Sequence, residues 1–159
     1  EQTRPGEGAM VARLVRAGSR RGGEADAPAT TLNPPPHVAG YLAQVTTVRL
    51  GRYRRPFNAK REVDWIAAAV DLATVAIFLS GAQGWPVLED DYRSVAAELS
   101  ARAGRTIEHQ TYKQLCGEFH SASAFGFSVA VDLVQRIRSG VLLYTLSPRG
   151  GKALCCVQP

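Results

Sequence analysis

Apolar residues recur at helical spacing through much of residues 62–139, and this recurrence predicts four helices. The first covers about 62–79, where the apolar stretch 65–79 is interpreted as a buried core helix. The second covers 88–103; acidic residues at its start suit the positive end of the helix dipole, and Gly104 closes it. The third covers 106–120 with Thr106 as its N-cap, and the fourth covers about 125–139.

Two segments depart from helical spacing and predict β-structure. Residues 41–53 are rich in Val, Thr and Tyr, which is typical of a strand. Residues 141–157 contain the apolar runs VLLYTL and ALCCV, joined by a Pro- and Gly-containing turn, and predict a β-hairpin. Upstream, residues 20–36 contain two glycines and four prolines and are interpreted as a linker.

These elements predict a mostly α protein. Its fold is expected to be a four-helix compact domain with a C-terminal β-hairpin, preceded by an extended basic arm. The expected organisation is a basic Pro/Gly-rich arm over residues 1–36, a strand and basic loop over 37–61, and a helical domain with the hairpin over 62–159.

Composition places the chain among globular proteins, with 45% hydrophobic and 21% charged residues in 159. The longest apolar stretch, 65–79, contains Asp71 and is shorter than the roughly 20 residues a bilayer requires, so no membrane span is expected. Three cysteines, two of them adjacent, do not form a disulfide framework and favour an intracellular location. The Arg-rich, acid-free residues 10–23 are also typical of an organelle transit peptide, and an organelle or a virion is compatible with the sequence.

Charge is distributed unevenly along the chain. Residues 1–61 contain eleven Lys/Arg and four Asp/Glu, a net charge of +7, whereas residues 62–159 contain eight and ten, a net charge of −2. Ten of the eleven basic residues are Arg, which binds phosphate through two parallel hydrogen bonds. The asymmetry predicts an acidic partner for the N-terminal part, and nucleic acid is favoured over an anionic membrane surface.

The expected nucleic-acid-binding residues lie in the arm and in the segment Arg52-Tyr53-Arg54-Arg55, where arginines would contact phosphates and Tyr53 would stack on a base. The alternative for this segment is a solvated loop that packs Tyr53 on the domain. The full set of predicted site residues is Arg13, Arg16, Arg20, Arg21, Arg49, Arg52, Tyr53, Arg54, Arg55, Lys60 and Arg61.

No catalytic or cofactor motif is present, and the sequence predicts a non-enzyme without metal or cofactor. Cys116 and His120 have the spacing of one helical face, and Cys155 or Cys156 would be needed to complete a zinc site, but paired C-x-x-C spacing is missing. His37, His109 and His120 are candidate general bases that lack a nucleophile in a recognisable local context.

The segment YRSVAAELSARAGRTIEHQTYKQLCGEF, followed by another helix and a hairpin with an Arg-Gly-Gly-Lys tip, resembles winged-helix and Myb/SANT-type tri-helical domains over residues 88–159. The resemblance implies DNA binding, with residues 107–120 or 125–139 as the recognition helix and Arg149 and Lys152 at the wing. Charge opposes it, because the predicted third helix carries Glu108 and Glu118 against Lys113 alone.

The sequence therefore favours a non-catalytic structural subunit of a nucleic-acid-containing assembly, such as a ribonucleoprotein, an organellar ribosome or a nucleocapsid. RNA is the favoured nucleic acid, and neighbouring protein subunits are the other expected partners. A winged-helix or helix-turn-helix DNA-binding protein is the alternative.

Overall fold

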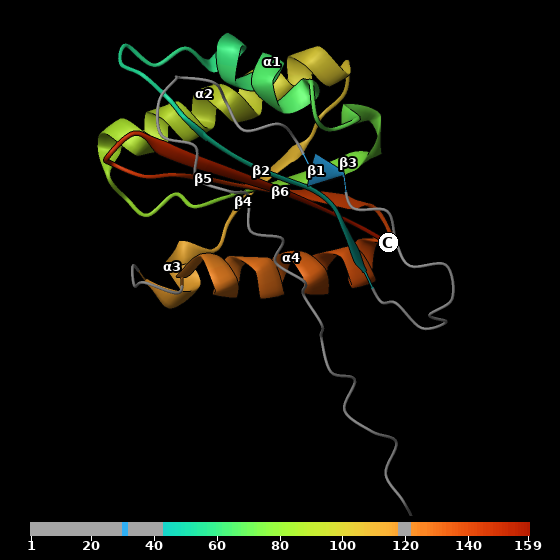
Figure 1. The fold of residues 1–159 in the computed structure, drawn as a ribbon. Helices are drawn as coiled ribbons and strands as arrows, with labels where there is room; N and C mark the ends of the chain where they lie inside the picture. The colour runs from blue at the N-terminus through green and yellow to red at the C-terminus, as the bar shows by residue number, and fades with distance from the viewer. Residues whose placement is uncertain (1–29, 32–42, 118–121) are drawn as a thin grey trace, which may run out of the picture.

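A mixed β-sheet separates two layers of helices in the computed structural model, which describes residues 30–31, 43–117 and 122–159 (Figure 1). Helices α1 (Ala59–Ala67) and α2 (Pro86–Ala103) cover one face of the sheet, and α3 (Lys113–Cys116) and α4 (Ala122–Ile137) cover the other. The order of the strands across the sheet is β1 (Thr30–Thr31), β2 (Gln44–Arg52), β6 (Gly151–Gln158), β5 (Gly140–Leu146), β3 (Val75–Ser80) and β4 (Glu108–Thr111).

Strands β2, β5, β3 and β4 all run in the same direction. Strand β3 pairs in parallel with both β4 and β5, while β6 runs antiparallel between β5 and β2. The chain passes from β3 to β4 through α2 on one face, and from β4 to β5 through α3 and α4 on the other. The fold is therefore a doubly wound α/β sheet whose four parallel strands end at the same edge, here called the carboxyl edge.

Strand β5 shows why the sheet has a core on each face. Leu142 and Tyr144 belong to the core beneath α1 and α2, whereas Val141 and Leu143 belong to the core against α4. Successive side chains of a strand point to opposite faces, so a strand covered on both sides is apolar throughout. All four residues are buried, which explains the unbroken apolar run VLLYTL.

The sheet contradicts the mostly α fold expected from the sequence. The predicted helix over 62–79 is the clearest error: α1 ends at Ala67, Asp71 caps a short 3₁₀ turn (Leu72–Thr74), and the rest is strand β3. A continuous apolar run fits a buried parallel strand as well as a buried helix. Here the segment forms a strand rather than a helix, because pairing with β5 and β4 supplies the backbone hydrogen bonds of β3 from both sides.

The predicted third helix over 106–120 is also wrong. Residues Glu108–Thr111 form β4, paired in register with Ile77–Ser80, and within residues 106–117 only Lys113–Cys116 are helical. The four residues of β4 are all polar and carry no apolar alternation, so hydrogen bonding to β3 defines this strand. His120 lies outside the described residues.

Other predicted elements are confirmed. Helix α2 ends at Gly104, which has the left-handed φ of 63° expected of a C-terminal glycine, and Glu89 lies in its first turn. Helix α4 matches the predicted fourth helix within a few residues, and β5 and β6 form the predicted antiparallel hairpin. Strand β2 lies within the predicted 41–53 strand and pairs with β6 along its length.

A buried ion pair joins α1 to the centre of the sheet. Glu62 accepts hydrogen bonds at Oε2 from Lys152 Nζ at 2.9 Å and from the Tyr144 hydroxyl at 2.8 Å. The ammonium group of Lys152 also lies 4.1 Å from the centre of the Trp65 ring. Because the side chains of Lys152 and Glu62 are only 5% and 9% exposed, loss of either charge leaves its partner buried without compensation.

We expect Lys152→Met to lower the free energy of unfolding by about 3–5 kcal/mol, since the Glu62 carboxylate would stay buried without its cation. Urea denaturation monitored by circular dichroism measures this change. The double variant Glu62→Leu with Lys152→Met removes both charges, so it should recover part of the loss. A double variant as unstable as the sum of its single variants would contradict the assignment.

Candidate ligand-binding groove

An open groove of about 380 Å³ lies at the carboxyl edge. Three of the four parallel strands contribute to it through the segments that follow them. Tyr53 and Arg55 follow β2; Trp85, Val87 and Leu88 follow β3 at the start of α2; Pro148 and Gly150 belong to the β5–β6 turn. In doubly wound sheets, ligands bind in the crevice outside the carboxyl ends of the strands, which makes this groove the candidate site.

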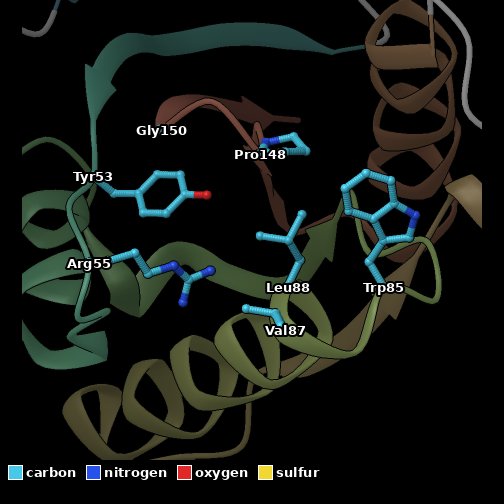
Figure 2. A pocket seen from close by; sticks show the side chains of 7 residues that line it. All are labelled: Tyr53, Arg55, Trp85, Val87, Leu88, Pro148 and Gly150. Carbon is cyan, nitrogen blue, oxygen red and sulfur yellow. The ribbon is translucent and has the colours of Figure 1, made fainter.

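The lining side chains surround the opening from several directions (Figure 2). Tyr53 and Arg55 lie on one side, Trp85 lies across from them, and Leu88 and Pro148 occupy the space between. Trp85 is 55% exposed and Val87 is 63% exposed, whereas Leu88 is buried. Large apolar side chains that gather at an opening mark sites for an apolar partner.

Polar groups on the Tyr53 side of the groove already have partners within the protein. The Tyr53 hydroxyl donates to the Ser147 carbonyl at 2.8 Å, and the Tyr53 amide donates to the Gly150 carbonyl at 2.9 Å. The Gly150 amide in turn donates to the Ser147 carbonyl at 2.9 Å. These bonds fix the β5–β6 turn against the segment after β2 and engage the hydroxyl and the amide of Tyr53 within the protein.

Arg55 is held by a two-point ion pair with Asp91 of α2. Its two terminal nitrogens donate to the two carboxylate oxygens at 3.1 and 2.6 Å, and the side chain also lies near the rings of Tyr53 and Phe57. Hydrogen bonding to Asp91 raises the pKa of Arg55, opposed by its own burial, so the guanidinium keeps its charge. The Arg55 side chain is 47% exposed and that of Asp91 is 9% exposed, so the pair presents mainly its positive member.

The predicted nucleic-acid-binding residues separate into three groups in the structure. Arg49, Tyr53 and Arg55 make internal contacts: Arg49 donates to the Trp65 carbonyl at 2.5 Å and lies over its ring, and Tyr53 is buried. The exposed residues of the set are Arg52, Arg54, Lys60, Arg61 and also Arg55, which pairs with Asp91. The predicted arm residues Arg13, Arg16, Arg20 and Arg21 lie outside the described residues.

Of the two segments assigned to a recognition helix, 125–139 lies largely on α4, whereas 107–120 does not form one helix. Residues 107–117 contain β4 and α3, and Lys152 is buried against Glu62. Arg149 alone of the two wing residues is exposed, at the tip of the β5–β6 turn.

The parallel pairing of β3 and β4 brings Ser80 and His109 together. Ser80 Oγ and His109 Nε2 are 2.8 Å apart. Sequence reasoning gave His109 no nucleophile, because Ser80 is 29 residues away and reaches it only through parallel pairing. Ser80 is fully buried, however, so its hydroxyl does not reach the groove or solvent, and the pair holds β4 against β3.

The three cysteines do not form a cluster with His109, the one histidine among the described residues. Cys116 lies on α3, whereas Cys155 and Cys156 are adjacent on β6. Burial raises the pKa of Cys155 to about 12 and also raises that of Cys156, so both thiols are protonated near neutral pH and poor metal ligands. Within residues 30–31, 43–117 and 122–159, no three His, Cys, Asp or Glu side chains gather as a metal site would require.

No protein-family model matches the chain, and no curated protein is significantly similar to it. In the part of the chain that the structure describes, no helix combines the length and apolarity needed to cross a bilayer. The fold and the groove together define the class: a doubly wound α/β domain with an open apolar groove at the carboxyl ends of its parallel strands.

The sequence singled out Tyr53 and Arg55 as site residues but missed the other residues of this groove, although Trp85 carries a usable signal. Trp85 occupies the N-cap position of α2 before Pro86 and makes no side-chain capping hydrogen bond. Ser, Thr, Asp and Asn are the preferred N-cap residues because they bond the first free amides. A large aromatic residue at such a position indicates a role other than capping.

The His109 environment predicts a pH-dependent stability. Burial lowers the pKa of His109 below its ordinary value of 6.5, with a smaller lowering by Arg93 and an opposing effect of Glu89. The folded state therefore binds a proton less readily than the unfolded state, so stability present above about pH 6.5 is lost as the pH falls.

We expect the free energy of unfolding to fall between pH 7 and pH 5 less steeply in His109→Gln than in the unaltered protein. Urea titrations across this range measure both slopes, and the other two histidines are common to both proteins. Parallel pH profiles would show that His109 is not the responsible group.

Proposed function

We propose that this chain is a ligand-binding domain whose carboxyl-edge groove binds an apolar organic molecule. One observation carries the proposal: Trp85 and Val87 expose apolar surface at the opening, while the Tyr53 hydroxyl and amide are bonded within the protein. An apolar or aromatic ligand would remove the exposed surface from water.

The dimensions and construction of the groove support this role. A volume of about 380 Å³ is within the range of small-molecule sites. The Tyr53 wall is fixed by the hydrogen bonds to the β5–β6 turn, and Arg55 is held by Asp91. A preformed wall lowers the ordering cost of binding, so affinity depends chiefly on contact with the apolar side chains.

The uncharged fluorescent probe N-phenyl-1-naphthylamine tests the proposal. We expect it to bind with a stoichiometry of one per chain, and Trp85→Ala to weaken binding about tenfold, because a central Trp commonly supplies more than 1 kcal/mol at a binding site. Fluorescence titration measures both. Leu115→Ala is the matched control, since Leu115 is an exposed apolar residue of α3, on the other face of the sheet.

The expected result is a loss of affinity in Trp85→Ala and none in Leu115→Ala. Absence of probe binding to the unaltered protein, or equal losses in the two variants, would refute the proposal.

A second proposal is that the chain is a non-catalytic structural subunit of a nucleic-acid-containing assembly, with RNA as the preferred ligand. Its support is the +7 net charge of residues 1–61, together with the exposure of Arg52, Lys60 and Arg61 near the end of β2 and the start of α1. Basic side chains on such a surface bind phosphates and release counterions, which makes affinity strongly dependent on salt.

Binding of single-stranded RNA and duplex DNA at several salt concentrations tests this second proposal. Two multiple variants to Gln separate the contributions: one of Arg13, Arg16, Arg20 and Arg21, the other of Arg52, Lys60 and Arg61. We expect the slope of log affinity against log salt to become shallower by about 0.7 for each phosphate of single-stranded RNA that the variant no longer neutralises. No affinity at low salt, or unchanged slopes in both variants, would refute it, and sequence-specific duplex binding would favour the DNA-binding alternative.

A further inference from the structure

We infer that residues 10–17 of this chain dock on an apolar patch of the sheet, formed by Val48 and Leu50 of β2 with the neighbouring Ala153 and Cys155 of β6. This inference does not depend on either proposed function. It rests on the way β2 distributes its side chains between the two faces of the sheet, and on the place where the N-terminal segment joins the sheet.

Strand β2 has the reverse of the usual distribution of polar and apolar side chains. Thr47 and Arg49 face the covered side, where they donate hydrogen bonds to backbone carbonyls of α1 and of the segment that follows it. Because side chains alternate along a strand, Val48 and Leu50 face the other side, where they are 39% and 60% exposed. A strand with one solvated face normally turns its apolar side chains toward the covered face. The reversal in β2 therefore indicates a further contact on the uncovered side.

The apolar surface continues from β2 onto β6. Cys155 pairs with Val48 and Ala153 pairs with Leu50, and directly paired residues of antiparallel strands lie on the same face. Both β6 residues are only partly buried, and Cys155 packs against the core beneath α4. Val48 and Leu50 thus form an exposed border of the apolar layer under α4, and no element among the described residues covers them.

Residues 10–17 lie outside the described residues, but their sequence, MVARLVRA, has the pattern of a short amphipathic helix. The four large apolar side chains share one side of such a helix: Met10, Val11, Leu14 and Val15. Arg13 and Arg16 fall on the opposite side. A helix with one apolar and one basic side can cover a small apolar surface and keep its charges in water. The segment therefore has the chemistry that the patch requires of an occupant.

The N-terminal segment joins the sheet next to the patch. Strand β1 pairs with β2, and Thr30 lies directly opposite Val48. The connection from the segment to β1 consists of residues 18–29, and twelve residues span up to about 40 Å when extended. The patch lies within two strand spacings of β1, or about 10 Å. The connection is therefore long enough to place residues 10–17 over the patch.

The size of the patch favours a tethered segment over a separate partner. Stable interfaces between proteins use about 20–30 residues on each side, whereas this patch consists of four side chains. A segment of the same chain needs fewer contacts, because its effective concentration is set by the connection and reaches about the millimolar range. Docking in this way would also turn Arg13 and Arg16, which belong to the predicted phosphate-binding set, away from the sheet.

Hydrogen–deuterium exchange of the full chain, measured by mass spectrometry, tests the inference. We expect the amides of residues 10–17 to exchange about tenfold more slowly than in a free peptide of the same sequence, because a helix this short is marginal in water unless it is docked. Leu50→Thr should remove most of this protection, since it takes apolar surface from the patch while keeping a residue that suits a strand.

Leu115→Thr is the matched control. Leu115 is a leucine of α3 that is 72% exposed, and α3 follows β4, which lies at the opposite edge of the sheet from β1. We expect this variant to keep the protection of residues 10–17.

Substitutions in the segment itself give an independent measurement, because they change no residue of the sheet. In amide NMR spectra of the full chain, Leu14→Ser should shift the signals of Val48, Leu50 and Cys155. Arg13→Gln, on the opposite side of the predicted helix, should leave these signals in place.

Four results would overturn the inference. The first is exchange of residues 10–17 as fast as in the free peptide, and the second is protection that Leu50→Thr retains or that Leu115→Thr removes equally. The third is a spectrum of Leu14→Ser in which the three sheet signals do not move. The fourth is protection that decreases on dilution, since a second copy of the chain would then be the occupant of the patch.

Discussion

Strand β6 is the element on which the other parts of the structure depend, because it is the single antiparallel strand between two parallel ones. Its hydrogen bonds to β5 on one side and β2 on the other bring the carboxyl ends of these strands to the same edge, separated by the width of one strand. The same strand carries Lys152, whose buried pairing with Glu62 anchors α1 over the sheet. A buried ion pair is tolerated only with good geometry, and here the Tyr144 hydroxyl completes it.

The construction of the groove follows from this arrangement. Because β6 begins where β5 and β2 end, the β5–β6 turn lies directly beside the segment after β2, and Tyr53 bonds to it through both its amide and its hydroxyl. Arg55 then bonds to Asp91 and so links the same segment to α2. Each of the three walls is therefore tied to a regular element, while Trp85 remains exposed at the start of α2. A stable domain that keeps a large aromatic side chain exposed in this position is consistent with a binding role.

Helices and strands with strong local signals were predicted correctly from the sequence. Segments whose structure depends on tertiary pairing were not. Helix α2 has acidic residues at its start, Gly104 at its end and buried residues that recur at helical spacing, so local signals suffice to predict it. Strand β3 has no such signal, because an apolar run buried on both faces carries neither helical nor strand periodicity. For the same reason the groove was not predicted: its residues come from three segments that are brought together by the sheet order, and sheet order is not encoded in any local pattern.

The segment after β2 contains residues that belong to each of the two proposals. Tyr53 and Arg55 line the groove, whereas Arg52, Lys60 and Arg61 are exposed and do not line it. The sequence interpretation treated all of these basic residues as one phosphate-binding group, since composition does not distinguish a guanidinium used in an internal ion pair from one that faces solvent. Arg55 and Arg49 have internal partners, so replacing them would disturb packing as well as charge. Arg52, Lys60 and Arg61 do not line the groove, whereas Trp85 does, so the two proposals are tested at different side chains.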